Sequence, residues 1–150
     1  MSADERGMAL PLALFALVVI GALVAGAFAG AVLEQRVGQN TLYGVQAAEA
    51  AEAGAAAVVG AWDSHGLGSL LPGQAAALAP VRLPGGTRYE PSVQRLNPEL
   101  FELRVTGTRL DAEGGTLARR GLTLVLRRAD SAVSGAATVV PLASRAWSSP

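Results

Sequence analysis

The chain has 150 residues, no cysteine and a net charge of zero, with 12 basic and 12 acidic side chains. Without cysteine it can hold neither a disulfide framework nor a thiolate metal site. The balanced charge gives no electrostatic reason to expect a nucleic-acid partner. Once a membrane helix and its extension are set aside, about 90 residues remain, enough for one small domain with a modest core.

The N-terminus consists of a short polar segment, residues 1–7, set directly against a long apolar run. Arg6-Gly7 ends the polar segment, and from Met8 to Leu33 every residue is uncharged and nearly all are apolar. As a helix this run measures about 39 Å, which is long enough to cross a bilayer. We predict a leader over residues 1–7 and the transmembrane half of a helix over residues 8–33.

Two other interpretations of this segment remain open. As a secretory signal peptide, it would be cleaved at Ala27-Phe28-Ala29 or Ala29-Gly30-Ala31. Against that, Asp4 and Glu5 outnumber Arg6 ahead of the run, and the run exceeds the usual apolar region of a signal peptide. As a plain single-pass anchor the length fits, but the flanking charges do not indicate an orientation.

Glycines inside the apolar run form a GxxxG pattern at Gly26 and Gly30. In lipid this spacing allows two helices to approach closely, so both residues are candidates for helix packing. A chain with 18 glycines also produces such a spacing by chance.

Residues 34–62 are alanine-rich, free of proline and of helical type. We expect one helix of about 50 residues in total, some 75 to 80 Å long, whose second half is amphipathic. Gly38-Gln39-Asn40 is a local weak point, and Asp63 to Gly66 ends the helix. The glutamates should face water, while the positions expected to lie against a small domain are Val37, Leu42, Val45, Ala48, Ala51, Ala55, Val58 and Val59.

Two sequence features together resemble the PilX-type minor pilins of type IV pili. They are Arg6-Gly7 before the apolar run and Ala50-Ala51-Glu52-Ala53-Gly54, which is similar to that family's Ala-Ala-Glu-Ala-Gly signature. The resemblance implies that a prepilin peptidase cleaves between Gly7 and Met8 and that Met8 is then methylated. It also implies a single-pass precursor in the bacterial inner membrane with an extracytoplasmic C-terminal domain. Implied partners are other pilins and minor pilins, the prepilin peptidase, the inner-membrane assembly platform and the lipid bilayer.

The mature chain departs from most major pilins at its fifth position. Major pilins carry a glutamate there, and this chain has Leu12. A buried acid can pair with the N-terminal amine of a neighbouring subunit, whereas Leu12 adds only apolar helix packing. We therefore expect a subunit at a tip, in a priming complex or at a rare position. Pro11 is tolerable in a first helical turn.

Residues 63–150 are predicted to form a small antiparallel β domain. Gly66 to Pro84 is proline- and glycine-rich and should be a surface connection. Alternating apolar residues predict a three-stranded meander and a possible fourth strand: Thr87 to Leu96, Leu100 to Gly107, Leu117 to Arg128, then Ala136 to Ala146. The fold class is therefore α+β, with the helix supplying a partner for the apolar face of the sheet.

Catalytic, cofactor and metal sites are not indicated. His65 is the only histidine, and Glu49 and Glu52, three apart on a helix, fit a solvated face. A basic edge from Arg104, Arg109, Arg119-Arg120 and Arg127-Arg128 lacks the interleaved aromatic residues that stack on bases, which argues against a nucleic-acid partner. Two function classes remain: a minor pilin or pseudopilin of a type IV pilus or related secretion system, and an anchored or secreted binding module with a ligand site on loops such as Gly66 to Pro84.

Overall fold

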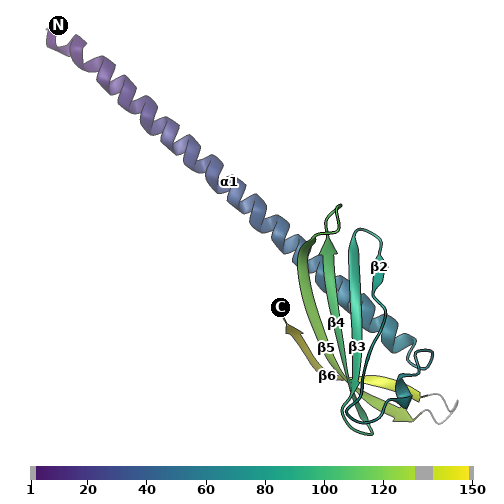
Figure 1. The fold of residues 1–150 in the computed structure, drawn as a ribbon. Helices are drawn as coiled ribbons and strands as arrows, with labels where there is room; N and C mark the ends of the chain where they lie inside the picture. The colour runs from purple at the N-terminus through teal and green to yellow at the C-terminus, as the bar shows by residue number, and fades with distance from the viewer. Residues whose placement is uncertain (1–2, 131–136, 149–150) are drawn as a thin grey trace. The chain divides into compact units, whose positions relative to one another are not determined.

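The structure is a computed structural model that describes the backbone of residues 3–130 and 137–148 and the side chains of residues 10–129 and 138–142. It divides into two compact units, residues 1–39 and residues 40–150. Helix α1 crosses this boundary, and its second part packs on a small antiparallel sheet, which confirms the predicted pilin-like α+β fold (Figure 1). The elements in order are α1 (Ala3–Gly60), the 3₁₀ turn η1 (Leu67–Ser69), β1 (Ala75–Ala77), β2 (Val81–Leu83), β3 (Thr87–Arg95), β4 (Leu100–Leu110), β5 (Thr116–Asp130) and β6 (Ala137–Ser148).

Helix α1 is longer at its start than the sequence indicated. It begins at Ala3, ahead of Met8, and it passes through the expected weak point at Gly38 without a break. One glycine costs a helix only about 1 kcal/mol, which the surrounding helix-forming residues outweigh. The helix ends at Gly60, and the turn that follows leads to Gly66, whose positive φ of 63° precedes η1.

The sheet has the strand order β1-β3-β4-β5-β6, with β2 also paired to β3. All these pairings are antiparallel, so the predicted meander is confirmed as β3-β4-β5 and the possible fourth strand as β6. Strand β4 extends past Gly107 to Leu110, and β5 reaches Asp130. Residue 136, where the fourth strand was expected to begin, lies outside the described residues.

The segment Gly66 to Pro84 was predicted as a surface connection, and it is mostly exposed, but it also contains regular structure that was not predicted. It contains η1 and two short strands, β1 and β2, which both pair with β3. The change of partner occurs near Pro91, whose carbonyl oxygen accepts a hydrogen bond from the amide of Leu78 at 3.0 Å. In an antiparallel strand the amide and carbonyl of one residue point to the same side. The missing N–H of Pro91 therefore faces β1 and β2 and leaves the β3–β4 pairing intact.

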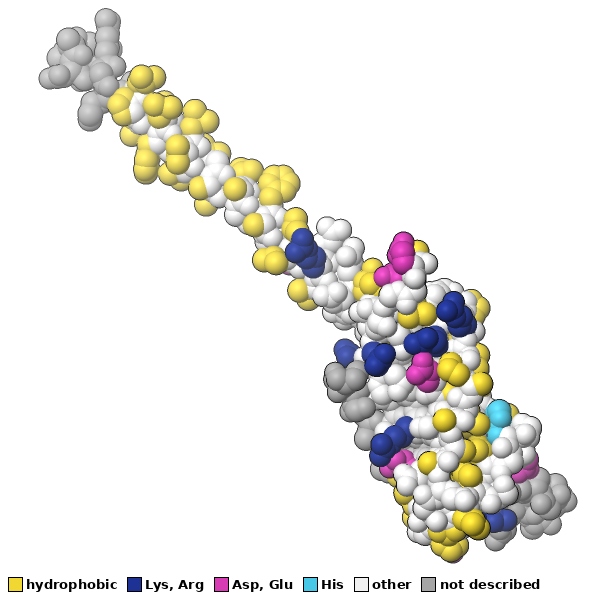
Figure 2. Space-filling view, in the orientation of Figure 1, with side chains coloured by type: hydrophobic (Ala, Val, Ile, Leu, Met, Phe, Trp, Pro, Cys, Tyr) yellow, Lys and Arg dark blue, Asp and Glu magenta, His cyan; other side chains and the backbone are white. Residues whose placement is uncertain are grey.

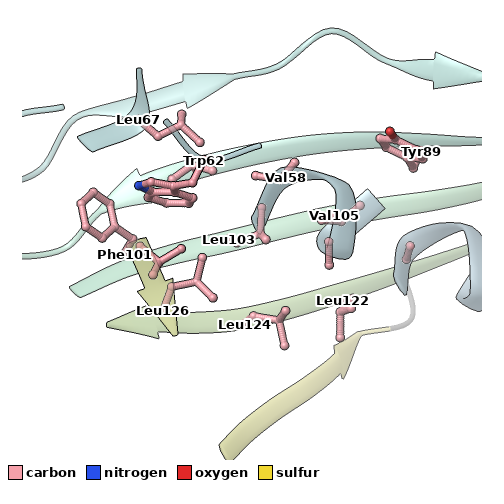
Figure 3. Close-up of a cluster of buried hydrophobic side chains, with 14 residues drawn as sticks. Val58, Trp62, Leu67, Tyr89, Phe101, Leu103, Val105, Leu122, Leu124 and Leu126 are labelled. Atoms are coloured by element: carbon pink, nitrogen blue, oxygen red, sulfur yellow. The ribbon is translucent and has the colours of Figure 1, made fainter. Parts of the chain in front are cut away.

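An apolar core lies between the second part of α1 and the sheet (Figure 3). Alternate residues of β3, β4 and β5 point toward the helix, as predicted from their period of two. Trp62 lies just past the helix and meets Phe101 edge-on, with ring centroids 5.0 Å apart. The buried members of this core include Ala51, Ala55, Val58, Trp62, Leu67, Tyr89, Val93, Phe101, Leu103, Val105, Leu122, Leu124, Leu126 and Val139.

The face of α1 that contacts the sheet differs from the predicted one. Val37, Leu42 and Val45 were expected against the domain but are exposed, at 65%, 53% and 50%. Ala51, Ala55 and Val58 are buried as expected, whereas Ala48 and Val59 are only partly buried. The contact face consists mostly of the smallest residues: Gly44, Ala47, Ala50, Ala51, Gly54, Ala55 and Val58.

Candidate assembly surfaces

The apolar part of α1 is uncovered. Every side chain from Leu10 to Leu33 is exposed, including Leu12 at 71%. By length and composition this helix could cross a membrane, which supports a single-pass anchor. In Figure 2 yellow side chains lie along the visible face of this part of the helix. An apolar surface of this extent indicates contact with lipid or with other helices.

Gly26 and Gly30 lie in this uncovered part of α1. A Cβ atom built on either glycine meets nothing within 4 Å, and the same is true of Gly21. Residues four apart lie on the same helical face, so Gly26 and Gly30 leave a shallow site where another helix could approach. Their role in helix packing stays a prediction.

The predicted cleavage junction lies within the helix. Gly7 and Met8 both belong to α1, although the side chains of residues 1–9 are outside the described part. Pro11 has no N–H, and in an α-helix the amide of residue 11 would bond the carbonyl of residue 7. The carbonyl of the Gly7–Met8 peptide bond therefore lacks its helical hydrogen bond.

The Ala50–Gly54 signature lies at the contact between α1 and the sheet. Ala50, Ala51 and Gly54 are buried, whereas Glu52 and Ala53 are exposed. A Cβ atom on Gly54 would lie 2.7 Å from Cδ2 of Tyr89 and 2.8 Å from Cγ1 of Val105. The small residues of the signature therefore permit close packing, and its glutamate stays in solvent.

Gly107 of β4 completes this contact from the side of the sheet. A Cβ atom there would overlap the carbonyl oxygen of Ala47 and lie 2.6 Å from the amide nitrogen of Ala51. The sequence suggested only a strand end at Gly107. Its role depends on which helix residues lie above β4, and no local pattern in the sequence gives that.

A groove of about 510 Å³ opens beside this contact. It lies where the β5–β6 register shifts between Leu124 and Leu126, opposite Pro141. Its lining is mainly apolar, with Glu52 as the one carboxylate among the lining residues. The lining residues are Glu52, Ala55, Ala56, Val59, Gly60, Leu122, Leu124 and Pro141.

The residues weighed for chemistry are dispersed. His65, Glu49 and Glu52 are all exposed. Within the described residues no three His, Asp or Glu side chains group closely enough to hold a metal ion. The predicted basic edge is divided between the two faces of the sheet. Arg109 lies on the helix side, 6.0 Å from the ring centroid of Tyr43, whereas the alternation along β5 places Arg119 on the opposite face.

Comparison with known proteins identifies no relative. No family model, no curated protein and no solved structure matches the chain. The function is therefore inferred from the geometry of the chain itself and from the resemblance of its short motifs.

Proposed function

We propose that the chain is a minor pilin or pseudopilin subunit of a type IV pilus or a related secretion system. The observation that carries this proposal is that the two parts of α1 have different surroundings. Residues 10–33 expose apolar side chains on all sides, and Ala47 to Val58 form one layer of the core of the small sheet. One helix thus provides an anchor for the membrane and a scaffold for the domain.

Before assembly, the apolar part of α1 holds the precursor in the inner membrane. The domain beginning at Asn40 lies on the extracytoplasmic side, and the leader lies in the cytoplasm. The apolar run exceeds the roughly 30 Å hydrocarbon core, so it can span the bilayer with some tilt. This topology places Gly7–Met8 near the cytoplasmic membrane surface, where a membrane peptidase can reach it.

Processing is aided by Pro11. Because Pro11 has no N–H, the carbonyl of the scissile peptide bond lacks the hydrogen bond that it would accept in an uninterrupted helix. A peptidase needs access to that carbonyl, and the missing hydrogen bond lowers the cost of drawing it out of the helix.

Assembly proceeds by helix packing and requires no chemistry from this chain. Other pilins and minor pilins contact the exposed apolar side chains of α1, and Gly26 and Gly30 permit close approach. Leu12 cannot form the ion pair that an acid would make with a neighbour's N-terminal amine. The subunit accordingly occupies a tip, a priming complex or another rare position.

Mass spectrometry of the N-terminus, with and without a co-expressed prepilin peptidase, tests the proposal. We expect a product that starts at methylated Met8 only when the peptidase is present. A Gly7→Leu variant should stay uncut because its side chain crowds the scissile bond, whereas the matched control Gly21→Leu should be processed normally. Cleavage near Ala29 or Ala31 would indicate a secreted binding module, and an uncut wild-type chain would indicate a plain membrane anchor.

A further inference from the structure

Three arginines and a threonine form a row across the sheet. Strand register pairs Arg82 of β2 with Arg88 of β3, Arg88 with Thr108 of β4, and Thr108 with Arg119 of β5. Directly paired residues share a face of a sheet. The neighbouring Gly107 faces α1, so this row lies on the opposite face. In Figure 2 dark blue side chains gather across the strands on the visible face.

Positive charge in this row is only partly compensated. Like charges directly opposite each other in a sheet are unfavourable. Arg88 binds Glu90 at 3.0 Å, which neutralises the middle arginine. Within the described part of the chain, the side chains of Arg82 and Arg119 make no hydrogen bond or ion pair. Two uncompensated guanidinium groups therefore flank the centre of the row.

The centre of the row contains unpaired donors. Thr108 is 1% exposed, and its hydroxyl has no hydrogen-bond partner. The Nε atom of Arg88 is buried and unpaired as well. Buried polar groups are nearly always bonded in folded proteins, so two unpaired donors on residues that are directly paired in register indicate a place for an acceptor.

None of the nearby carboxylates that the structure describes accepts a hydrogen bond from Thr108 or from Nε of Arg88. Glu102 is engaged by Arg104, and the carboxylate of Asp111 accepts a hydrogen bond from the amide of Gly115 at 2.5 Å. Asp111 and Glu113 line a hollow by the β4–β5 loop together with Arg82, but neither carboxylate forms an ion pair with Arg82 among the described residues. Glu90 is paired with Thr106, two residues before Thr108, and its carboxylate already binds Arg88.

We propose that the Arg82–Arg88–Thr108–Arg119 row binds a phosphate group. Phosphate oxygens act as acceptors, can receive bonds from several donors at once, and carry up to two negative charges, which matches the two uncompensated arginines. The Thr108 hydroxyl and Arg88 Nε donate at the centre, and Arg82 and Arg119 close on the ligand from the two sides. The phosphate is that of an anionic phospholipid headgroup or of a free phosphate compound. This site is independent of the helix-packing role of α1.

Calorimetric titration of the full chain in phosphatidylcholine nanodiscs with inorganic phosphate, at constant ionic strength set by chloride, tests the site. We expect saturable binding that weakens at least tenfold in Thr108→Val and in Arg119→Gln. Arg127→Gln is the matched control, because Arg127 is exposed on the same strand and face but lies away from the row. It should leave the affinity unchanged.

Folding and ligand binding are separated by thermal melts in chloride. Thr108→Val keeps the shape of the side chain and removes an unpaired hydroxyl, so its melting temperature should equal or exceed that of the wild type. A folded Thr108→Val variant that binds phosphate as tightly as the wild type would overturn the proposal. So would equal losses in Arg119→Gln and Arg127→Gln, or the absence of saturable binding in the wild type.

The source of the phosphate is resolved by repeating the titration in nanodiscs that contain phosphatidylglycerol. If headgroups occupy the row, the response to inorganic phosphate seen in phosphatidylcholine nanodiscs disappears there, and Arg119→Gln does not restore it. If the ligand is a free phosphate compound, the response is the same in both lipids. Either result supports the site and identifies where its phosphate comes from.

Discussion

At the scale of single residues, two glycines set the distance between α1 and the sheet. Gly54 faces Tyr89 and Val105, and Gly107 faces the helix backbone at Ala47 and Ala51. At Gly54 the opposing atoms belong to side chains, which can shift to some extent. At Gly107 the opposing atoms are backbone, which can yield only if the helix moves.

Gly107→Ala should therefore destabilise the domain by about 1–3 kcal/mol, the usual range for overpacking a well-packed core. Urea unfolding of the full chain in micelles, followed by tryptophan fluorescence, measures this loss. Gly60→Ala is the control, since a Cβ atom there meets nothing within 4 Å. It should gain about 0.5 kcal/mol through reduced backbone entropy. Equal stability of Gly107→Ala and the wild type would contradict the close approach of α1 to β4 at Gly107.

Arg95 joins two segments at one end of the sheet. Its guanidinium donates to the carbonyl oxygens of Leu70 at 2.6 Å, Asn97 at 3.1 Å and Pro98 at 2.7 Å, and it lies over the ring of Phe101. It thereby joins the segment after η1 to the β3–β4 turn. The arrangement uses the fork of donors that arginine has and glutamine lacks.

Arg95→Gln should lower the free energy of unfolding by about 1–3 kcal/mol, because several charge-assisted hydrogen bonds are lost. The same urea titration measures the effect. Arg104→Gln serves for comparison. Arg104 is exposed and, among the described side chains, pairs only with Glu102, so its loss should cost less than about 1 kcal/mol. If both variants lost the same free energy of unfolding, the hydrogen bonds of Arg95 would not hold the two segments together.

At the scale of elements, the first part of α1 is long and apolar enough to cross a membrane. Leu23→Arg, near the centre of the run, should impair membrane integration because a central arginine costs about 2.5–3.5 kcal/mol. Extraction of membranes with alkaline carbonate measures the integrated fraction. Leu42→Arg, exposed on the same helix but beyond the apolar run, should integrate like the wild type. Loss of integration in both variants would mean that the membrane-spanning segment extends as far as Leu42.

Pro11 gives a second prediction for α1. Pro11→Ala supplies the amide that bonds the Gly7 carbonyl, and one such hydrogen bond is worth about 0.5–1.5 kcal/mol. Cleavage by the prepilin peptidase should slow by about two- to tenfold, measured as the rate of leader loss in membranes. Leu14→Ala adds no donor at this carbonyl and should be cleaved at the wild-type rate. Faster cleavage of Pro11→Ala would overturn the proposed role of the proline.

The elements differed in how much of their structure could be predicted from the sequence. Strands β3, β4 and β5 follow from alternating residues such as Phe101, Leu103 and Val105, which are buried as predicted. Strands β1 and β2 have three residues each and exist only through pairing with β3, so no local pattern marks them. The contact face of α1 was misassigned because side-chain size pointed to Val37 and Val45, whereas close packing selects glycine and alanine.

At the scale of the whole molecule, the anchor and the small domain could be predicted, but the surfaces that depend on register could not. The signature Ala50–Gly54 was evident in the sequence, and the structure gives it a packing role. Gly107, the groove beside Pro141 and the arginine row arise from strands that are distant in sequence. Their members become neighbours only once the register of the sheet is known.

Incorporation into a filament tests the central claim most directly. Surface filaments sheared from cells that carry a complete pilus or secretion system should contain this chain, starting at Met8, in small amounts relative to the major subunit. Quantitative mass spectrometry of the sheared fraction gives both values, and cells with the Gly7→Leu variant should yield none. Recovery of the wild-type chain only in membranes with its leader intact, or only in the medium after cleavage near Ala29, would contradict the account.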